Sequence, residues 1–286
     1  MDVGFVGLGL MGLPMAHRLL SGGYTLHVYN RSPSKADDIV RAGAERCGSP
    51  AVVARHSAIV VTMVSTSDAL EEVSMGREGI LAGLAAGGIH VDCSTVAPSA
   101  TKKLFASYRA EHCHFVHSPV LGSVPQATDG SLLLFVGATD EAFIKAETLL
   151  RSFGSKVWRF DRVEEATNTK LACNFFIAGM ITLLAQNLVF LRRAGIDPKR
   201  FLEILAHSSL NSPMYQTKGA TMVDNNFAPR FFVEHMLKDI RLLLDAAHDL
   251  GAALPTAELA QSLFDKTVER GFAKEDYSAV IKVLED

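Results

Sequence analysis

Residues 2–20 read DVGFVGLGLMGLPMAHRLL, and this stretch decides the fold of the first half of the chain. The mainly apolar run at residues 2–6 ends in glycine and predicts a short buried strand. Apolar side chains then recur every three or four residues until Gly22-Gly23 ends the pattern. The sequence therefore predicts a strand, a glycine-rich turn and a helix over residues 11–20.

The glycines of this turn have the spacing G-x-G-x-x-G, at Gly7, Gly9 and Gly12. The spacing alone is a weak signal, but a strand before it and a helix after it are the context in which such a turn binds a dinucleotide. The first glycine permits the tight turn, the second lets backbone approach a pyrophosphate, and the third lets helix and strand pack closely. The helix N-terminus then faces the phosphate charge. We therefore expect a dinucleotide to lie against Gly7, Leu8, Gly9, Leu10, Met11 and Gly12.

The end of the second predicted strand, residues 25–30, distinguishes the two nicotinamide dinucleotides. A site for NAD usually has Asp or Glu here, whose carboxylate binds the ribose 2′-hydroxyl. This chain has Asn30, followed by Arg31, Ser32 and Lys35. A guanidinium can bind a 2′-phosphate through charge-assisted hydrogen bonds, and a serine hydroxyl can add another. The segment predicts NADPH/NADP as cofactor, with a preference for NADPH over NADH; the alternative is that Arg31 is a solvated surface residue.

Strand and helix signals alternate through about residue 160. Further strands are predicted at 58–64, 89–92 and 132–136, and a helix at 35–42. This alternation predicts an α/β domain over residues 1–162, a doubly wound, mostly parallel sheet of the Rossmann type. Strand-end loops of such a sheet border the ligand crevice, so Val64 and Ser65 are predicted to line the adenosine–ribose path.

The pattern changes near residue 163. Residues 164–193 contain no proline and one interior glycine, and a helix of that length is about 45 Å long, which suits a spine joining two domains. The remainder, 163–286, is predicted to be all-α, with helices at 198–207, 236–250, 256–270 and 277–284. Turns are predicted between them, among others at Asn211-Ser212-Pro213.

The composition bounds the class of protein. The 286-residue chain is 48% hydrophobic and 21% charged. Its net charge is −3, and residues of both signs are spread along its length. These values are typical of a globular protein and give no reason to expect nucleic acid or a membrane as a partner. Cys47, Cys93, Cys113 and Cys173 show no CxxC spacing, which favours free thiols in a reducing cytosol. With no basic leader, we expect a cytoplasmic protein.

With these features in view, the chain resembles the β-hydroxyacid dehydrogenase family over nearly its full length. The segments that carry the resemblance are GFVGLGLMGLPMAHRLL from Gly4, DCSTVAPSATKKL from Asp92, SPVLGSVPQATDGSLLLFVG from Ser118, TKLACNFF from Thr169 and HMLKDIRLLLD from His235. Within the family, NSPMYQTKG from Asn211, the segment from Phe227 to Asp239 and the Asn30-Arg31 pair resemble the short NADPH-dependent glyoxylate and succinic semialdehyde reductases.

The resemblance implies a role for particular residues. Ser94, Thr95, Gly122 and Ser123 stand on the substrate segments. Many members of the family have a second glycine where this chain has Ser123, a departure that is expected to alter the substrate pocket. Thr95 is also implied to face the nicotinamide, and Phe231 and Lys238 to reach the cofactor. The substrate-binding residues implied by the resemblance are Ser94, Thr95, Gly122, Ser123, Lys170, Asn174, Lys238 and Asp239.

Lys170 and Asn174 fall on the catalytic motif of that family. Their spacing of four places both side chains on one face of the predicted spine helix. An ammonium can stabilise the alkoxide that develops when a carbonyl accepts a hydride, and it can deliver the proton. We therefore expect Lys170 to be the proton donor and Asn174 to hold the substrate, with no metal required.

The function expected is NADPH-dependent reduction of small carboxylated aldehydes such as glyoxylate and succinic semialdehyde. The alternatives are a 3-hydroxyisobutyrate or related β-hydroxyacid dehydrogenase, an imine reductase, and a non-catalytic cofactor-binding interaction module. Imine reductases usually lack lysine at the position matched by Lys170, and the interaction modules have lost it. A long apolar spine helix would leave an apolar face uncovered, so a homodimer or homotetramer is also expected.

Overall fold

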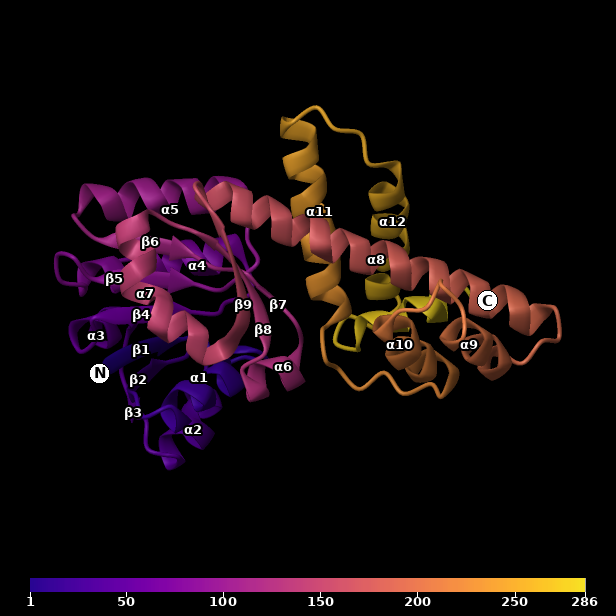
Figure 1. The fold of residues 1–286 in the computed structure, drawn as a ribbon, viewed down its shortest axis with the longest axis horizontal. Helices are drawn as coiled ribbons and strands as arrows, with labels where there is room; N and C mark the ends of the chain where they lie inside the picture. The colour runs from indigo at the N-terminus through magenta and orange to yellow at the C-terminus, as the bar shows by residue number, and fades with distance from the viewer. Residues whose placement is uncertain (286) are drawn as a thin grey trace. The chain divides into compact units, whose positions relative to one another are not determined.

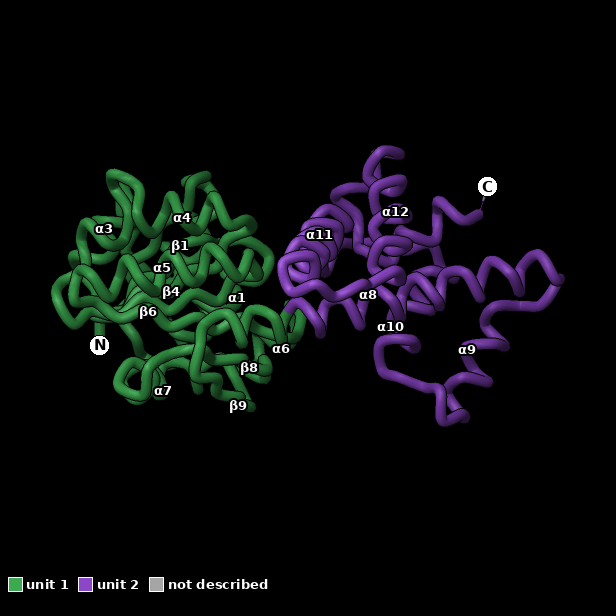
Figure 2. Tube along the Cα trace, turned by 90° about the horizontal axis from the view of Figure 1, so that it is seen from above, with its two compact units in different colours: residues 1–170 green, residues 171–286 purple. Residues whose placement is uncertain are grey.

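The computed structural model of the protein describes residues 1–285 and divides into two compact units, residues 1–170 and 171–286 (Figure 2). The division falls inside one long helix, α8 (Val163–Arg193), which the sequence predicts at 164–193. It lies beyond the predicted domain boundary between residues 162 and 163, because the first turns of α8 belong to the first unit.

Residues 1–170 are built on a nine-stranded sheet with the order β3-β2-β1-β4-β5-β6-β8-β7, in which β9 also pairs with β8 (Figure 1). The strands β1 to β6 pair in parallel, whereas β8 runs antiparallel to β6 and β7 and parallel to β9. The predicted doubly wound, mostly parallel sheet is confirmed. The strands are β1 (Asp2–Val6), β2 (Thr25–Tyr29), β3 (Glu45–Arg46), β4 (Ile59–Thr62), β5 (Ile89–Asp92), β6 (His114–His117), β7 (Val120–Leu121), β8 (Leu132–Gly137) and β9 (Gly154–Phe160).

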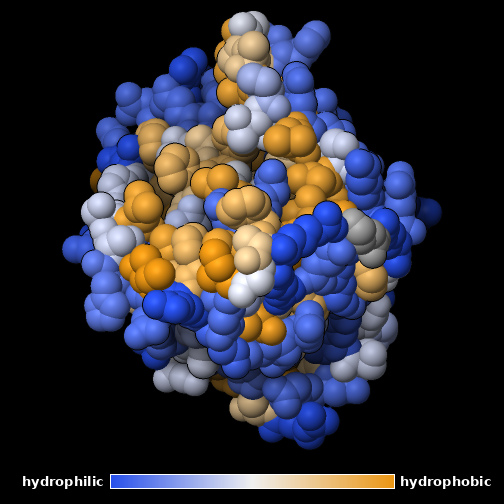
Figure 3. Space-filling model, turned by 90° about the vertical axis from the view of Figure 1, so that its right-hand side faces the viewer, coloured by the Kyte–Doolittle hydropathy of each residue, from blue (hydrophilic) through white to orange (hydrophobic). Residues whose placement is uncertain are grey.

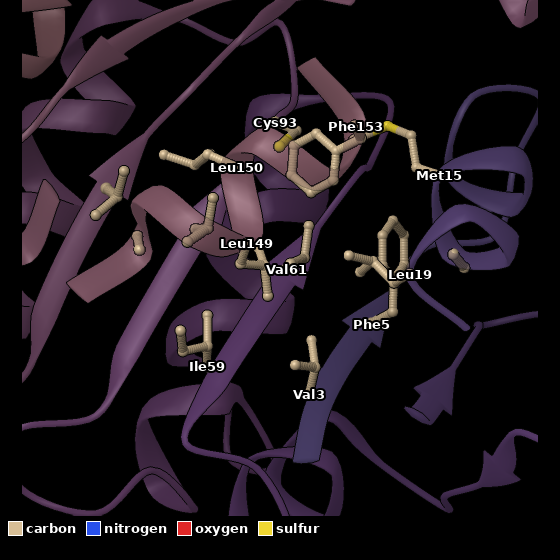
Figure 4. Packing of buried hydrophobic residues seen from close by; sticks show 14 of the residues in the cluster. Val3, Phe5, Met15, Leu19, Ile59, Val61, Cys93, Leu149, Leu150 and Phe153 are labelled. Atoms are coloured by element: carbon tan, nitrogen blue, oxygen red, sulfur yellow. The ribbon is translucent and has the colours of Figure 1, made fainter. Parts of the chain in front are cut away.

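Helices cover both faces of this sheet. On one face, side chains of α1 and α7 pack against alternate residues of β1 and β4, such as Phe5 and Val61 (Figure 4). On the other face, α3, α4 and α5 bury Val60, Phe115 and their neighbours. The helices of this unit are α1 (Gly12–Ser21), α2 (Asp37–Arg41), α3 (Pro50–Arg55), α4 (Ser67–Met75), α5 (Pro98–Ala110), α6 (Val124–Asp129) and α7 (Asp140–Phe153), with 3₁₀ turns η1 (Pro33–Ala36) and η2 (Ile80–Ala82).

The strand order places the candidate cofactor site. Chain order reverses between β1 and β4, since β2 lies on one side of β1 and β4 on the other. At such a switch point the loops that follow the two strands diverge, and ligands bind in the crevice between them. The glycine turn follows β1 and the segment from Met63 follows β4.

Residues 171–285 are helical. The remainder of α8 packs with α9 (Pro198–Ala206), α10 (Pro213–Val223), α11 (Val233–Asp249), α12 (Pro255–Glu269) and the 3₁₀ segment η3 (Tyr277–Val283). Within residues 1–285, α8 is the one helix long and apolar enough to cross a membrane by length and composition. Its buried residues, including Ile181 and Leu188, belong to the hydrophobic core of the second unit, as in the core helix of a globular domain.

Three local predictions differ in part from the structure. Asn211 and Ser212 lie in the connection between α9 and α10, as predicted, but the helix α10 that follows was not predicted: the Ser212 hydroxyl accepts the Tyr215 N–H at 3.1 Å and Pro213 occupies the first helical position. The predicted helix at 277–284 is the 3₁₀ segment η3. The predicted helix at 35–42 is split into η1 and α2.

Candidate active site

The glycine turn leaves no room for side chains at its first and third glycines. Gly7 has φ +99°, and a Cβ there would lie 2.3 Å from the Met63 carbonyl oxygen. A Cβ on Gly12 would lie 1.9 Å from the Gly7 carbonyl oxygen. Both contacts are with backbone that cannot move aside, so the turn, the start of α1 and the end of β4 can approach this closely only with glycine at both positions.

The second glycine faces open space, as a pyrophosphate site requires. A Cβ on Gly9 would meet no heavy atom within 4 Å. Within residues 1–285, the N–H groups of Gly9, Leu10 and Met11 donate to no protein acceptor. Open space beside unused backbone donors at the beginning of a helix is a ready site for phosphate oxygens. The residues of the turn therefore fit the dinucleotide predicted for them.

Asn30 holds the turn from the β2 side. Its Oδ1 accepts the Leu8 N–H at 2.9 Å and its Nδ2 donates to the Ser32 carbonyl oxygen at 2.8 Å. The sequence predicts Asn30 as a cofactor contact, whereas the structure uses its amide to fix the turn and the segment after β2.

The cations predicted to bind the 2′-phosphate lie on that segment. Arg31, Ser32 and Lys35 are exposed. The nearest acidic side chains along the chain are engaged elsewhere, because Asp37 pairs with Arg46, and Asp38 with His17 and Arg41. The local charge at the end of β2 is therefore positive, which favours a phosphorylated ribose.

Ser94 lies just after β5 and points into the interior of the first unit. Its side chain is fully buried, and its hydroxyl donates to Asp92 Oδ1 at 2.7 Å and accepts the Val64 N–H at 2.9 Å. Its own N–H donates to Asp92 Oδ1. Since these groups are buried and already paired, Ser94 has an internal role in this structure, and its predicted contact with substrate stays a prediction. Thr95, the next residue, is half-buried, and Ser65, on the loop that follows β4, is exposed.

Asp92 is the central acceptor of a buried hydrogen-bond network, and no sequence pattern indicated that its members would meet. Thr62 and Ser94 donate to its Oδ1, and His117 Nδ1 lies 3.0 Å from its Oδ2. Burial would raise the pKa of Asp92, but the hydrogen bond from His117 and the other donors outweigh burial and lower it. Burial lowers the pKa of the neighbouring His90 to about 4. The signal in the sequence was weak: polar residues at alternate positions of the apolar run from Ile89.

The loop after β7 uses its polar groups for its own conformation. Gly122 has φ +145°, which favours glycine, and a Cβ there would lie 2.7 Å from Leu132 Cδ2. Ser123 has extended backbone and forms a capping box with Gln126 at the start of α6. The Ser123 N–H donates to Gln126 Oε1 at 2.9 Å, so this group is already used within the loop, and the predicted contact of Ser123 with substrate stays a prediction. Extended backbone is open to any residue, so serine is accommodated at this position without strain.

The catalytic motif lies on α8. Lys170 and Asn174 are 6% and 5% exposed. Asn174 Nδ2 donates to Asp239 Oδ2 of α11 at 2.5 Å, and Lys238 Nζ lies 2.9 Å from Asp239 Oδ1. Because a carboxylate only accepts hydrogen bonds, the amide must present its nitrogen to Asp239, and the direction of its carbonyl oxygen is fixed as a result. The structure thus joins three of the predicted residues in one cluster, in which Asn174 and Asp239 are buried and Lys238 is half-buried.

Phe231 is held by a second buried carboxylate, that of Asp276, which no sequence pattern indicated. Its ring packs edge-on against Tyr277, at 6.0 Å between centroids, and its N–H faces Asp276 Oδ2 at 3.4 Å. Asp276 also forms a buried ion pair with Lys218, with Nζ 2.7 Å from Oδ1. Asp276 lies outside the motifs, and Lys218 falls within the segment from Asn211 without a role implied for it, so no spacing in the sequence paired the two. Within residues 1–285, no group of three or more His, Cys, Asp or Glu side chains could hold a metal ion.

Comparison with known proteins agrees with this geometry. Residues 2–167 match the NAD-binding domain of 6-phosphogluconate dehydrogenase, and residues 165–284 match the NAD-binding domain of NADP-dependent 3-hydroxyisobutyrate dehydrogenase. Glyoxylate/succinic semialdehyde reductase 2 of Arabidopsis thaliana is 30% identical over 283 residues, which cover 99% of this chain and 79% of the reductase. The chain belongs to the β-hydroxyacid dehydrogenase family.

Two further comparisons cover nearly the whole length of this β-hydroxyacid dehydrogenase. An uncharacterised oxidoreductase of Bacillus subtilis is 36% identical over 288 residues, covering 99% of this chain and 100% of that protein. The solved structure of Psf3 in complex with NADP+ and 2-OPP has a TM-score of 0.91 and 26% identity, covering 99% of each chain. The protein is therefore an NAD(P)-binding oxidoreductase, and NADP(H) is its cofactor.

Proposed function

We propose that this β-hydroxyacid dehydrogenase reduces small carboxylated aldehydes, such as glyoxylate and succinic semialdehyde, to hydroxy acids, with Lys170 as the proton donor. The observation that carries the proposal is the burial of Lys170 one helical turn before Asn174, whose amide is fixed by Asp239. A buried lysine followed at that spacing by an oriented amide provides both a cation and a positioned polar group for a carbonyl substrate.

In this reaction the residues of the chain stabilise negative charge and supply one proton. Bound NADPH supplies the hydride. The Lys170 ammonium stabilises the negative charge that develops on the carbonyl oxygen and transfers its proton to that oxygen, which becomes the hydroxyl of the product. Asn174 holds the reacting carbonyl or the carboxylate of the substrate through hydrogen bonds, and the Lys238 ammonium, which is paired with Asp239, has further N–H groups that can donate to the carboxylate.

The test is a panel of two- to five-carbon aldehydes, with and without a carboxylate, in which NADPH oxidation is followed at several concentrations. We expect kcat/KM to be highest for the carboxylated members. Equal values for matched aldehydes without a carboxylate would contradict the proposal.

The second candidate is a 3-hydroxyisobutyrate dehydrogenase, which the family match of residues 165–284 favours. To distinguish this candidate, we would measure NADP+-dependent oxidation of 3-hydroxyisobutyrate. A kcat/KM for that oxidation above the kcat/KM for reduction of every aldehyde in the panel would favour the dehydrogenase. Turnover of either kind excludes the third candidate, a non-catalytic interaction module.

We also propose that the protein is a homodimer or homotetramer. Phe176, Leu183 and Phe190 of α8 are 72%, 57% and 68% exposed. Their spacing of seven places them on one stripe of the helix, as in the seam of a coiled coil. Apolar side chains also gather on the face of the protein shown in Figure 3. A second copy that buries this stripe would remove large apolar surface from water.

A further inference from the structure

Three neighbouring strands of the first unit end in a buried polar row. Thr62 on β4 is in register with Asp92 on β5, and Asp92 with His117 on β6. All three side chains are fully buried. Thr62 Oγ1 donates to Asp92 Oδ1 at 2.7 Å, and Asp92 Oδ2 and His117 Nδ1 are 3.0 Å apart. Burying a carboxylate costs free energy unless hydrogen-bond donors satisfy its oxygens, so we asked what structural role this buried row has.

The protonation of the row follows from its contacts. Asp92 is ionised because four donors converge on it, which agrees with its lowered pKa. His117 Nδ1 must then carry the hydrogen that it donates to Asp92 Oδ2. His117 Nε2 is buried with no protein partner within residues 1–285.

The row is connected to the glycine turn through Ser94 and Val64. The Ser94 hydroxyl donates to Asp92 and accepts the Val64 N–H, so it ties the loop after β4 to the end of β5. Val64 and Met63 form the wall against Gly7: the Met63 carbonyl oxygen and Val64 Cγ1 lie 2.3 Å and 3.1 Å from a Cβ built on that glycine. Asn30 holds the turn from the β2 side, and this chain of contacts supports it from the β4 side.

We propose that Asp92 and His117 are positioning residues for cofactor binding, which hold the loop after β4 against the glycine turn by way of Ser94 and Val64. His117 fixes the carboxylate through Oδ2, which leaves Oδ1 aimed at Thr62 and Ser94. If the carboxylate turns, Ser94 loses its acceptor, the Val64 N–H loses the fixed hydroxyl, and the wall beside Gly7 loosens. A loosened wall weakens binding of the cofactor while the groups of the catalytic motif stay in place.

The test compares two substitutions at one buried position. His117→Asn places an amide nitrogen where the ring nitrogen lies and keeps the donor to Asp92, whereas His117→Leu removes the donor and keeps apolar bulk. We expect the dissociation constant of NADPH, measured by fluorescence titration without aldehyde, to stay within about twofold of wild type in His117→Asn. We expect it to rise roughly 3- to 30-fold in His117→Leu, the range for energetic coupling through a contact network.

Kinetics and a control separate positioning from stability. In His117→Leu, KM for NADPH is expected to rise more than kcat falls. Ser57→Ala removes a buried hydroxyl that has no protein partner within residues 1–285, in the turn before β4, and should leave NADPH affinity unchanged. If His117→Leu is folded and binds NADPH as tightly as wild type, or if His117→Asn is impaired equally, the proposal is wrong.

A second variant covers the case in which His117→Leu does not fold. Ser94→Ala removes the hydroxyl between Asp92 and Val64 but leaves the other donors to Asp92. We expect its NADPH dissociation constant to rise in the same range, and an unchanged value would overturn the proposal. Because these titrations contain no aldehyde, their outcome does not depend on which substrate the enzyme reduces.

Discussion

Asn174 on α8 donates a hydrogen bond from its amide nitrogen to the Oδ2 carboxylate oxygen of Asp239 on α11, across 2.5 Å. Both side chains are buried, and Lys238 lies against the other oxygen of the same carboxylate. Asp239 thus sets the orientation of the Asn174 amide and balances the charge of Lys238, although neither role can be read from a motif in which Asp239 simply follows Lys238.

Replacement of Asp239 with alanine should impair catalysis through Asn174. Without the carboxylate the amide can rotate, and a misplaced polar group costs on the order of 10- to 100-fold in kcat/KM. Loss of a hydrogen bond to a charged group should also lower the free energy of unfolding by about 1.5–3 kcal/mol. Steady-state kinetics and urea unfolding check both. Asp245→Ala, an exposed carboxylate on the same helix, is the control and should change neither.

Lys170→Ala should abolish most of kcat and spare cofactor binding. The proton donor and the cation that stabilises the alkoxide are lost together, and general acid catalysis alone contributes about 10²- to 10⁴-fold. The measurements are kcat with the best aldehyde and NADPH affinity by fluorescence. Turnover near that of wild type would refute the assigned role.

Substitutions after β2 should separate the two functions assigned to that segment. Arg31→Ala removes charge-assisted hydrogen bonds to the 2′-phosphate, so NADPH should bind about 10- to 100-fold more weakly while NADH is unaffected. Asn30→Asp keeps an acceptor for the Leu8 N–H but adds a negative charge, so it should shift preference toward NADH. Asn30→Ala loses the acceptor and should weaken both cofactors. Equal kcat/KM for NADPH and NADH in the wild type would sink the assignment of specificity.

Stability should fall on acidification because of His90. Burial lowers the pKa of His90 to about 4, with Asp92 opposing the shift and His117 adding to it. A group whose folded pKa is depressed contributes stability that is fully present above its unfolded pKa, near 6.5, and is lost as the pH falls through the folded value. The loss between these limits is on the order of 3 kcal/mol.

Urea unfolding at intervals from pH 7 to pH 4 measures this slope. His90→Gln keeps an amide N–H for Thr62 and removes the titration, so its stability should vary less over the window. If the free energy of unfolding falls equally with pH in wild type and in His90→Gln, the loss of stability arises from groups other than His90. Asp92, with its lowered pKa, adds a further loss in the same direction at more acidic pH.

Leu183→Glu should dissociate the proposed oligomer. A carboxylate in the middle of the Phe176–Phe190 stripe is costly to bury in an interface. Light scattering should show a smaller mass than that of wild type. Ile144→Glu, at an apolar residue of the first unit that is 69% exposed, is the matched control and should leave the mass unchanged. A monomeric wild type would count against the proposal at once.

The sequence by itself determined the elements whose signals are local. The glycine spacing after a strand, the apolar strands at β4 and β5 and the proline-free run of α8 each depend on neighbours within a few turns, and the structure confirms them as elements. The same locality explains the errors. Ser212-Pro213 suits both a turn and a helix start, and only the packing of α10 decides between them.

Only the tertiary structure decided which polar groups meet. Ser94 and Val64 are 30 residues apart, Asp92 and His117 are 25 apart, and Asn174 and Asp239 are 65 apart, yet each pair is joined by a hydrogen bond. Periodicity shows which face of a strand or helix a residue occupies, but the register between elements sets its partner. Ser94 could therefore be predicted at a strand end, while its burial against Asp92 depends on how β4, β5 and β6 align, because hydrogen bonds between distant segments form only when packing brings their backbones into register.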